Sequence, residues 1–283
     1  MPSPDLSFCG TIYIMKKETI NGVPVLVYPE LEKLDFIKHC FSTREGGVSS
    51  GIFESMNLSF TRGDDEENVK ENFHRIASVM EEAVDNFVLS EQTHTTNVYV
   101  VTKKDAGIGL TRPKPYTDVD GLITNEPNLV LSCFFADCVP LYIIDVKNKA
   151  IGLSHSGWRG TAGRIGKVTI EKMHEEYGTN PEDLICAIGP SICKSCYEIS
   201  RDVAEIFTEE FKGFEDRILE EKPNDKFLLD LWETNKIVFK EAGVKEENII
   251  LPNICTCCNP NLLFSHRASK GKRGNLGAFL CIK

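Results

Sequence analysis

The chain is poor in histidine and shows no excess of glycine, proline or positive charge. Only six of its 283 residues are histidine, and its 21 glycines and 13 prolines exclude collagen-like and low-complexity classes. The 41% hydrophobic and 26% charged residues are typical of a globular protein. With 32 basic against 42 acidic residues, the net charge is −10, so we expect no nucleic-acid or membrane partner.

A long apolar run is also missing. The longest, Leu129 to Ile144, is interrupted by Asp137 and Pro140 and is too short to span a bilayer. Met1 to Lys17 lacks a basic start followed by an apolar stretch, so we expect no signal peptide. The eleven cysteines are an odd number spread over the chain, unlike a secreted disulfide framework. We therefore expect a cytoplasmic protein with reduced thiols.

Short apolar runs separated by turn residues predict a strand-rich α/β protein with a mixed sheet covered on both faces. The predicted strands are 97–102, 121–124, 129–135, 139–145, 150–154, 184–188, 249–252 and 276–282. Helices are predicted over 161–177, 201–211 and 231–242, and one more begins at Asp64, which can cap it. Residues 214–226 are interpreted as a surface connection, and no domain boundary is evident.

Three segments place a metal ligand or nucleophile beside a turn. They contain His94, Asp137 with Cys138, and His155. If strands 139–145 and 150–154 pair as a hairpin, Cys138 and His155 meet at one edge of the sheet. A lone cysteine or histidine in such a region is more often part of the core. Asp137, however, is a charge in an apolar run and is costly to bury without a partner, which favours a site.

Arginines next to small residues are candidate anion sites. Arg159 and Arg164 stand at a glycine-rich helix start, Arg44 lies in a small-residue loop, and Arg267 follows a cysteine cluster. The helix start lacks the Gly-Lys-Ser/Thr ending of a P-loop. Close packing of glycines and ordinary ion pairs of the arginines are the alternative explanation for all of them.

Two cysteine groups invite comparison with a structural zinc site. Cys193 and Cys196 form a CxxC pair, whereas Cys255, Cys257 and Cys258 form a CxCC group. Two CxxC pairs would be a strong zinc signal, and the CxCC spacing is a weaker one. Buried thiols in an apolar environment are the alternative.

Taken together, the motifs resemble the YfiH/YlmD family. They are, in order, FSTREGGVSSGIFESMNLSF, QTH, DGLIT, ADCVPL, HSGWRGTAGRI, AIGPSICKSCYEI, LDLWETNK, CT and FSHR, between Phe41 and Lys283. The family is also called the laccase-domain or multicopper polyphenol oxidase family. Its members are described as purine nucleoside phosphorylases with adenosine deaminase activity, and in some bacteria as a peptidoglycan editing factor.

The resemblance implies a fold, a metal and a set of site residues. The fold is a layered, mixed-sheet α/β single domain over residues 1–283, similar to the YfiH-like putative cysteine hydrolase fold. The metal is zinc, with His94, Cys138 and His155 as ligands. The substrate- and phosphate-binding residues are placed at Arg44, Asn57, Arg159 and Arg267. The ending departs from the family, which usually has an aromatic residue at the position of His266 and a Thr-Gly-Arg in place of Lys272-Arg273-Gly274.

The implied chemistry is that of an open zinc site. Three protein ligands leave a position for water, which zinc activates near neutral pH. Attack on C6 of adenine would deaminate adenosine, and phosphate attack on the sugar would give free base and ribose 1-phosphate. Asp137, beside a ligand, is the candidate proton shuttle for deamination.

Three other interpretations stay open. Cys138 and His155 could form a metal-free cysteine hydrolase dyad, with peptidoglycan precursors as one class of substrate. A copper polyphenol oxidase would need roughly ten imidazoles and is disfavoured by the six histidines. A non-enzymatic protein would use the loops as a partner surface. The sequence does not fix the preferred nucleoside or the oligomeric state.

Overall fold

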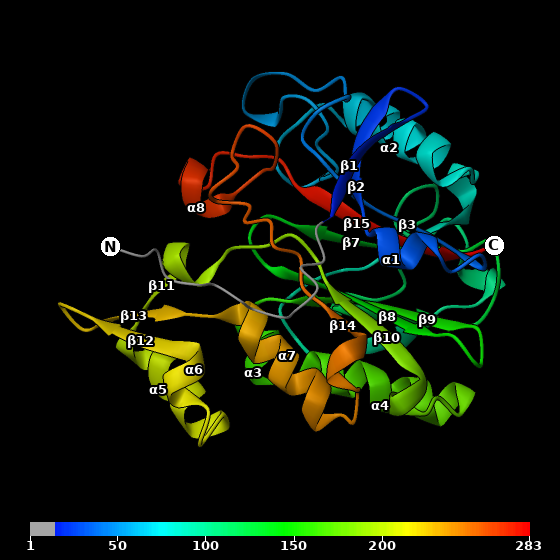
Figure 1. Ribbon diagram of the computed structural model, residues 1–283. Helices are drawn as coiled ribbons and strands as arrows, with labels where there is room; N and C mark the ends of the chain where they lie inside the picture. Colours follow the sequence, from blue (N-terminus) through cyan, green and yellow to red (C-terminus); the bar gives the residue numbers. More distant parts are fainter. Residues whose placement is uncertain (1–14) are drawn as a thin grey trace, which may run out of the picture.

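Two six-stranded sheets are stacked face to face in the computed structural model, which describes residues 15–283 (Figure 1). The first sheet runs in the order β1 (Lys16–Ile20), β2 (Val23–Val27), β3 (Ile37–Ser42), β15 (Leu276–Ile282), β7 (Val130–Phe135) and β4 (Phe87–Leu89). The second runs β14 (Ile249–Ile250), β10 (Leu184–Ile188), β8 (Val139–Asp145), β9 (Ala150–Ser156), β6 (Gly121–Thr124) and β5 (Val98–Val100). Both sheets mix parallel and antiparallel pairs, as predicted.

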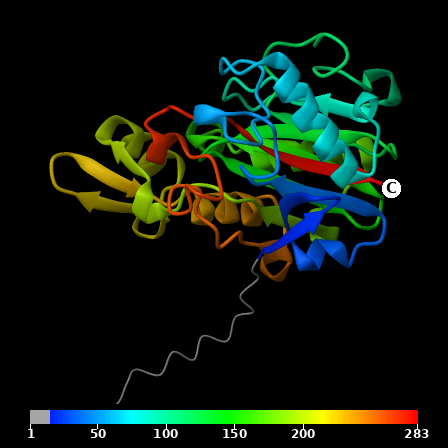
Figure 2. The same cartoon turned by 90° about the horizontal axis from the view of Figure 1, so that it is seen from above.

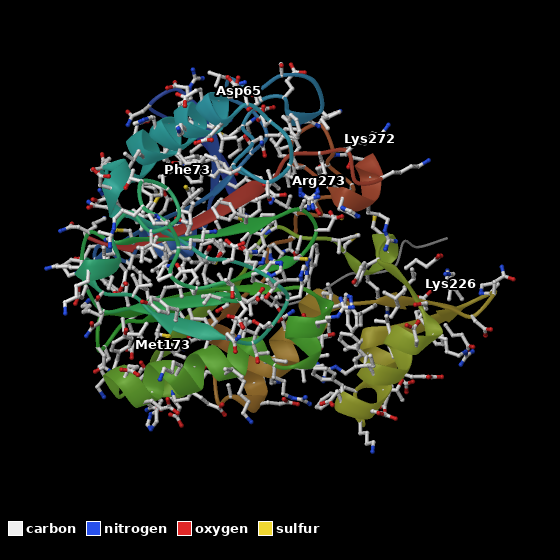
Figure 3. The ribbon with its side chains drawn as sticks, turned by 180° about the vertical axis from the view of Figure 1, so that it is seen from behind. Asp65, Phe73, Met173, Lys226, Lys272 and Arg273 are labelled. Carbon is white, nitrogen blue, oxygen red and sulfur yellow. The ribbon has the colours of Figure 1, made fainter. Side chains whose placement is uncertain are left out.

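The central core lies between the two sheets. Leu131 and Leu280 of the first sheet are fully buried in one cluster with Tyr142 and Leu153 of the second. The outer face of the first sheet is covered by α2 (Glu66–Met80), whose Phe73 lies beneath the helix in Figure 3. The outer face of the second is covered by α4 (Ile165–Tyr177) and α7 (Leu231–Glu241). Coverage on both faces explains the unbroken apolar strands and confirms the predicted burial.

Several predicted boundaries are wrong by a few residues. The N-cap of α2 is Asp65, whose carboxylate accepts from the Glu67 amide, whereas Asp64 accepts from Asn57 Nδ2. The helix predicted over 161–177 is two helices, α3 (Trp158–Ala162) and α4. The break falls at Arg164, which has φ 58°, a left-handed conformation that no helix continues through.

The segment 214–226 is not a plain connection. It forms α6 (Glu215–Ile218) and β12 (Leu219–Lys222), and β12 pairs with β13 (Lys226–Leu229). With β11 (Glu198–Ser200) these strands make a three-stranded sheet that lies beside α5 (Arg201–Glu210) and extends from the body of the molecule in Figure 2. Charged residues on both exposed faces of this hairpin hide the period-two alternation on which strand prediction depends.

Short elements complete the described chain. They are α1 (Pro29–Glu32), α8 (His266–Ser269) and the 3-10 turns η1 (Gly51–Phe53), η2 (Val84–Asn86), η3 (Lys103–Asp105), η4 (Pro181–Asp183), η5 (Lys194–Cys196) and η6 (Glu246–Asn248). Within residues 15–283 no helix combines the length and apolar character needed to cross a membrane. Residues 1–14, which hold Cys9 and most of the segment without a signal-peptide pattern, lie outside the described residues, so the N-terminal bound of the predicted 1–283 domain stays a prediction.

The predicted hairpin of β8 and β9 is confirmed. Its register pairs Val139 with Ser156 and Pro140 with His155, and β9 continues two residues beyond its predicted end. Cys138, directly before β8, therefore lies beside the end of β9 that carries His155.

Candidate functional site

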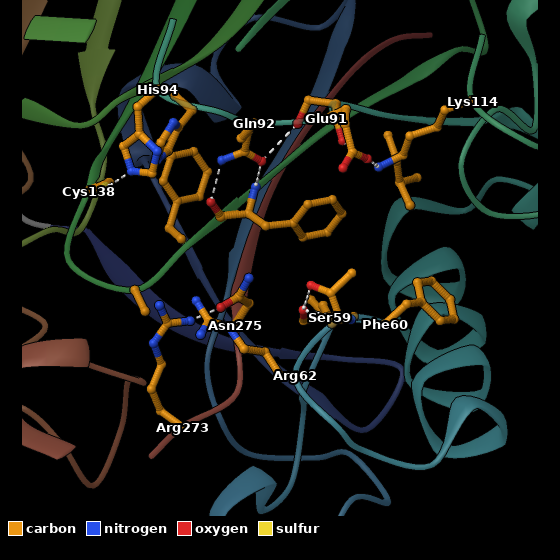
Figure 4. A pocket seen from close by; sticks show the side chains of 18 residues that line it. Ser59, Phe60, Arg62, Glu91, Gln92, His94, Lys114, Cys138, Arg273 and Asn275 are labelled. Atoms are coloured by element: carbon orange, nitrogen blue, oxygen red, sulfur yellow. Dashed lines mark hydrogen bonds and ion pairs between the residues drawn. The ribbon is translucent and has the colours of Figure 1, made fainter. Parts of the chain in front are cut away.

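Three side chains from distant parts of the chain converge at the end of this hairpin (Figure 4). His94 comes from the loop after β4, Cys138 from the turn between β7 and β8, and His155 from β9. Their ligand atoms lie within 4.8 Å of one another, with His94 Nε2 4.0 Å from Cys138 Sγ. The two imidazole rings are 4.9 Å apart and nearly perpendicular. The three atoms are therefore arranged so that one ion could contact all of them.

The backbone around these ligands is unusual. His94 has φ 67° and Asp137 has φ 92°, conformations that non-glycine residues seldom adopt. Gly157 supplies the close approach, because a Cβ there would lie 2.6 Å from His94 Cδ2 and 3.3 Å from Cys138 Sγ. Strained backbone that persists in a well-packed protein is typical of functional sites.

Asp120, at the start of β6, holds two of the three ligands. Its fully buried carboxylate accepts from the amides of Thr93, His94 and Thr95, from the Thr95 hydroxyl, and from His155 Nδ1 at 2.8 Å. The hydrogen bond to Nδ1 leaves Nε2 of His155 free to act as a ligand. Sequence reasoning missed this role, although an aspartate directly before a buried strand in DGLIT was the available signal.

The thiol and the imidazole polarise each other. Burial alone would raise the pKa of Cys138, but His155 and then His94 outweigh it and hold that pKa at about 6. Burial alone would lower the pKa of His155, but Cys138 and Asp120 outweigh it and raise that pKa to about 9. Burial likewise acts to raise the pKa of Asp120, yet the His155 hydrogen bond leaves it lowered. Cys138 is thus held as a thiolate near neutral pH, the form that binds metals or attacks electrophiles.

A cavity of about 240 Å³ opens beside the three ligands. All three ligands line it, together with Gln92 and two arginines, Arg62 and Arg273 (Figure 4). Gln92 is fixed by accepting from the Phe134 amide and donating to the Phe134 carbonyl. The cavity therefore has a ligand-bearing wall and a cationic wall.

The cationic wall is short of negative charge. Burial and the neighbouring Arg62 lower the pKa of Arg273 to about 10, so it stays charged at neutral pH. Among residues 15–283 the Nε of Arg273 is buried without a hydrogen-bond partner, and its Nη1 donates to Gly274 O and Asn275 Oδ1. Within residues 15–283 neither arginine forms an ion pair with a carboxylate. An anion in the cavity would offset this repulsion.

The arginines predicted from sequence lie elsewhere. Arg44 donates to Glu54 O and Pro260 O, both at 2.8 Å, and stacks on Phe264. Arg267 donates to the carbonyls of Cys196 and Glu198. Arg159 stacks on the indole of its neighbour Trp158 at 4.2 Å. None of the three lines the cavity of the histidine and cysteine ligands.

Asn57 and Asp137 hold segments of backbone next to the site. Asn57 is fully buried and accepts from the Asn275 amide, which orders the strand end next to Arg273. Asp137 accepts from Thr256 Oγ1 at 2.6 Å and from the Arg267 amide at 2.7 Å. Neither residue lines the cavity.

A group of four cysteines forms a second candidate metal site. The sulfur atoms of Cys193, Cys196, Cys255 and Cys258 all lie within 4.8 Å of one another and could hold a metal ion such as zinc. Cys257 is not a member of this group.

Comparisons with known proteins show which family the chain resembles. Residues 38–283 match the family model described as multi-copper polyphenol oxidoreductase laccase. The purine nucleoside phosphorylase YlmD of Bacillus subtilis is 34% identical over 244 residues, covering 86% of this chain and 87% of that protein. The adenosine deaminase RL5 of an unknown prokaryotic organism is 32% identical over 245 residues, covering 84% and 93%.

Solved structures show the same fold. The hypothetical protein YfiH of Bacillus licheniformis superimposes with a TM-score of 0.87 at 31% identity, covering 92% of this chain and 96% of that one. YlmD of Geobacillus stearothermophilus superimposes with a TM-score of 0.85 at 31% identity, covering 96% and 99%. The predicted YfiH-like α/β architecture is thereby confirmed.

Proposed function

The chain belongs to the family described as multi-copper polyphenol oxidoreductase laccase, which includes the YfiH and YlmD proteins, and we propose that it is a zinc-dependent purine nucleoside phosphorylase that also deaminates adenosine. The names of its relatives support both activities, since a phosphorylase and a deaminase are each more than 30% identical over most of the chain.

The ligand set fits zinc. Zinc bonds of about 2.0 Å to nitrogen and about 2.3 Å to sulfur bring tetrahedral ligands to within about 4 Å of one another. The 4.0 Å between His94 Nε2 and Cys138 Sγ is about 0.5 Å wider than the roughly 3.5 Å of such a pair, so a small side-chain shift would complete the site. Asp120 holds Nδ1 of His155, which leaves Nε2 as the ligand atom, and Gly157 has no Cβ to fill the space beside His94 and Cys138; both features favour an ion between the three side chains. In the proposal His94, Cys138 and His155 hold the zinc.

The proposal assigns phosphate to Arg62 and Arg273. Both line the cavity, and the unpartnered Nε of buried Arg273 is a donor that needs an acceptor. A phosphate dianion would accept from both guanidinium groups and remove their mutual repulsion. Arg44, Arg159 and Arg267 are already engaged outside the cavity and are less suitable for this role.

Both reactions need a positioned nucleophile and a held substrate. Zinc with three protein ligands supplies Lewis acidity at an open coordination position. Asp120 keeps the His155 tautomer and the His94 loop in place. Arg62 and Arg273 hold phosphate for attack on C1′ of the ribose, which breaks the bond to the purine and yields ribose 1-phosphate. Deamination uses water in place of phosphate and releases ammonia from C6.

One observation carries the proposal: a single cavity joins the His94, Cys138 and His155 ligands to two arginines that form no ion pair with any carboxylate of the described chain. The test is incubation of the purified protein with inosine, guanosine or adenosine, with and without phosphate, followed by chromatography of the products. We expect free base and ribose 1-phosphate only when phosphate is present, and inosine from adenosine in either case. Base release that does not depend on phosphate would contradict the phosphorylase assignment.

A metal-free cysteine hydrolase is the second candidate. The lowered pKa of Cys138 and the raised pKa of His155 favour a thiolate–imidazolium pair of the kind that cysteine nucleophiles use. That dyad gives no role to His94, whose ring contacts both residues. The two candidates therefore separate on the behaviour of a His94 variant.

Multinuclear copper chemistry has no ligand set to support it in residues 15–283. Of the six histidines, only His94 and His155 belong to a group that could hold a metal. His39 is buried with its Nε2 accepting from the Tyr28 amide, and His174 contacts the Thr179 carbonyl. The family description therefore does not extend to a multicopper oxidase in our proposal.

A further inference from the structure

Four cysteines from two distant segments form a compact cluster beside the small third sheet. After β10, Cys193 precedes η5 and Cys196 is its last residue, and Cys255 and Cys258 lie in the loop after β14. About sixty residues separate the two pairs, yet Cys196 Sγ lies 3.4 Å and Cys193 Sγ 3.9 Å from Cys258 Sγ. Cys193 and Cys196 have CxxC spacing. Cys255 and Cys258 have it too, since Cys257 between them does not belong to the group.

These separations suit a metal better than a disulfide. A zinc ion with four bonds of about 2.3 Å to sulfur places the sulfur atoms about 3.8 Å apart. The observed 3.4 Å and 3.9 Å bracket that value, whereas a disulfide bond is about 2.0 Å long. All four sulfur atoms lie within 4.8 Å of one another, a gathering of four thiols that a disulfide between two of them would not require. The geometry points to one tetrahedral ion bound by four thiolates.

Backbone donors support negative charge on the cluster. The amides of Cys193 and Cys258 both donate to Cys255 Sγ, at 3.3 Å and 3.4 Å. Cys255 is only 7% exposed, so its thiolate would be costly without such donors and a cation. No carboxylate belongs to the group, and tetrahedral all-sulfur sites select zinc or iron over harder ions.

We propose that Cys193, Cys196, Cys255 and Cys258 bind a structural zinc ion, separate from the ion proposed at His94, Cys138 and His155. Four protein ligands close the coordination sphere, so this ion has no position for substrate. Its role is to join the two loops that carry the cysteines.

Those two loops hold the turn before Cys138. The Ile192 amide donates to the Asp137 carbonyl, and Thr256, which lies between Cys255 and Cys257, donates its hydroxyl to the Asp137 carboxylate. The Thr256 amide in turn donates to the Ser191 carbonyl, so the two loops are also bonded to each other. Asp137 has a left-handed backbone that needs such support. The structural zinc therefore stabilises the conformation that presents Cys138.

Zinc content of four protein forms tests the assignment, with no dependence on activity. Elemental analysis of the wild-type protein should give about two zinc ions per chain. His94→Ala and Cys258→Ser should each give about one, because each removes a different ion. Cys257→Ser is the matched control, since it removes a neighbouring thiol outside the group and should keep both ions.

The pattern of results separates this site from the proposed catalytic one. One zinc in the wild-type protein and none in His94→Ala would overturn the four-cysteine site. One zinc in both the wild-type protein and His94→Ala, with none in Cys258→Ser, would support the four-cysteine site and contradict the zinc of the proposed function. Iron in place of zinc at the cluster would overturn the metal assignment.

Alkylation of the wild-type protein gives a second test if Cys258→Ser does not fold. The four cysteines should resist a thiol reagent until a chelator removes zinc, while half-buried Cys257 reacts. Peptide mass spectrometry assigns each labelled position. Labelling of the four cluster cysteines together with Cys257, without release of zinc, would contradict the proposal. A disulfide between Cys196 and Cys258 in the freshly purified protein would also contradict it.

Discussion

Replacement of the Asp120 carboxylate by an amide tests how the proposed zinc ligands are held. The two carboxylate oxygens divide the work: Oδ1 accepts from the His94 amide and from His155 Nδ1, and Oδ2 accepts from the Thr93 and Thr95 amides and the Thr95 hydroxyl. All five partners can donate to a carboxylate. The NH2 group of Asp120→Asn must take one of these two positions, and it is a donor itself.

Either orientation of the amide has a cost that the structure defines. With the NH2 group at the Oδ2 position, the amides of Thr93 and Thr95 lose their acceptor. With it at the Oδ1 position, the His94 amide loses its acceptor and His155 must accept at Nδ1, which places its proton on Nε2 and removes it as a ligand. A buried donor without a partner costs about 1–3 kcal/mol, so we expect about 1–6 kcal/mol less stability.

The zinc affinity of the site should fall about 10- to 100-fold in Asp120→Asn, the usual effect of losing a carboxylate behind a histidine ligand. Competition with a chromophoric chelator measures that affinity, and thermal unfolding monitored by circular dichroism measures the stability. Asp118→Asn is the matched control. Asp118 lies two residues before Asp120, and its carboxylate is exposed and contacts Asn97, so this variant removes the same charge without touching the proposed ligands. Equal zinc affinity in Asp120→Asn and Asp118→Asn would refute the reasoning.

Three further predictions follow from the site and its surroundings. His94→Ala should lose the zinc of this site and nearly all turnover together, whereas an active, zinc-free variant that is inactivated by alkylation of Cys138 would favour the hydrolase dyad. Arg62→Gln and Arg273→Gln should each raise the KM for phosphate by about 10- to 100-fold, since a hydrogen bond to a charged group is worth about 1.5–3 kcal/mol, and Arg44→Gln should leave it unchanged in steady-state assays. Burial lowers the pKa of His39 to about 3 from its ordinary value of about 6.5. The unfolded chain therefore binds the proton first, and the free energy of unfolding decreases as pH falls from 6.5 towards 3. Urea unfolding of His39→Gln should show a smaller decrease of that free energy over the same range.

The sequence predicted those parts of the site that depend on local pattern and neighbouring strands. Cys138 and His155 were expected to meet because a short turn joins two apolar runs, and the register of β8 and β9 confirms that expectation. His94 was also a candidate from its turn, but it lies 44 residues before Cys138, and only the family resemblance grouped it with the hairpin residues as a ligand. The structure places its imidazole beside the other two ligands.

The remaining parts depend on long-range packing that no local pattern reveals. Arg62 lies in the loop before α2 and Arg273 in the segment before β15, and these two segments are joined where Asn275 bonds to Asn57 and Leu58. Both arginines have a glycine as their next residue, Gly63 and Gly274, but neither lies within one of the motifs that contain Arg44 and Arg159. The four-cysteine cluster was obscured by Cys257, which turned a second CxxC pair into an apparent CxCC group.

The position of the acidic residues leads to a last prediction, which concerns the two proposed reactions. Asp137 was the predicted proton shuttle, but both of its oxygens accept hydrogen bonds from protein groups and it does not line the cavity. Among the described residues that line the cavity, Glu91 is the only carboxylate, and it is ion-paired with Lys114.

Glu91 should matter more for deamination than for phosphorolysis. Deamination must move a proton from water to the departing ammonia, and general acid–base catalysis of this kind contributes about 10²–10⁴-fold. Phosphorolysis takes its nucleophile already ionised, because inorganic phosphate is a mixture of mono- and dianion at neutral pH. Glu91→Gln should therefore slow adenosine deamination at least about tenfold more than inosine phosphorolysis, measured by product chromatography on one preparation. Lys114→Met is the control for the lost ion pair, since it keeps the carboxylate. An equal decrease of both rates in Glu91→Gln, matched by Lys114→Met, would show that the ion pair only supports the cavity wall.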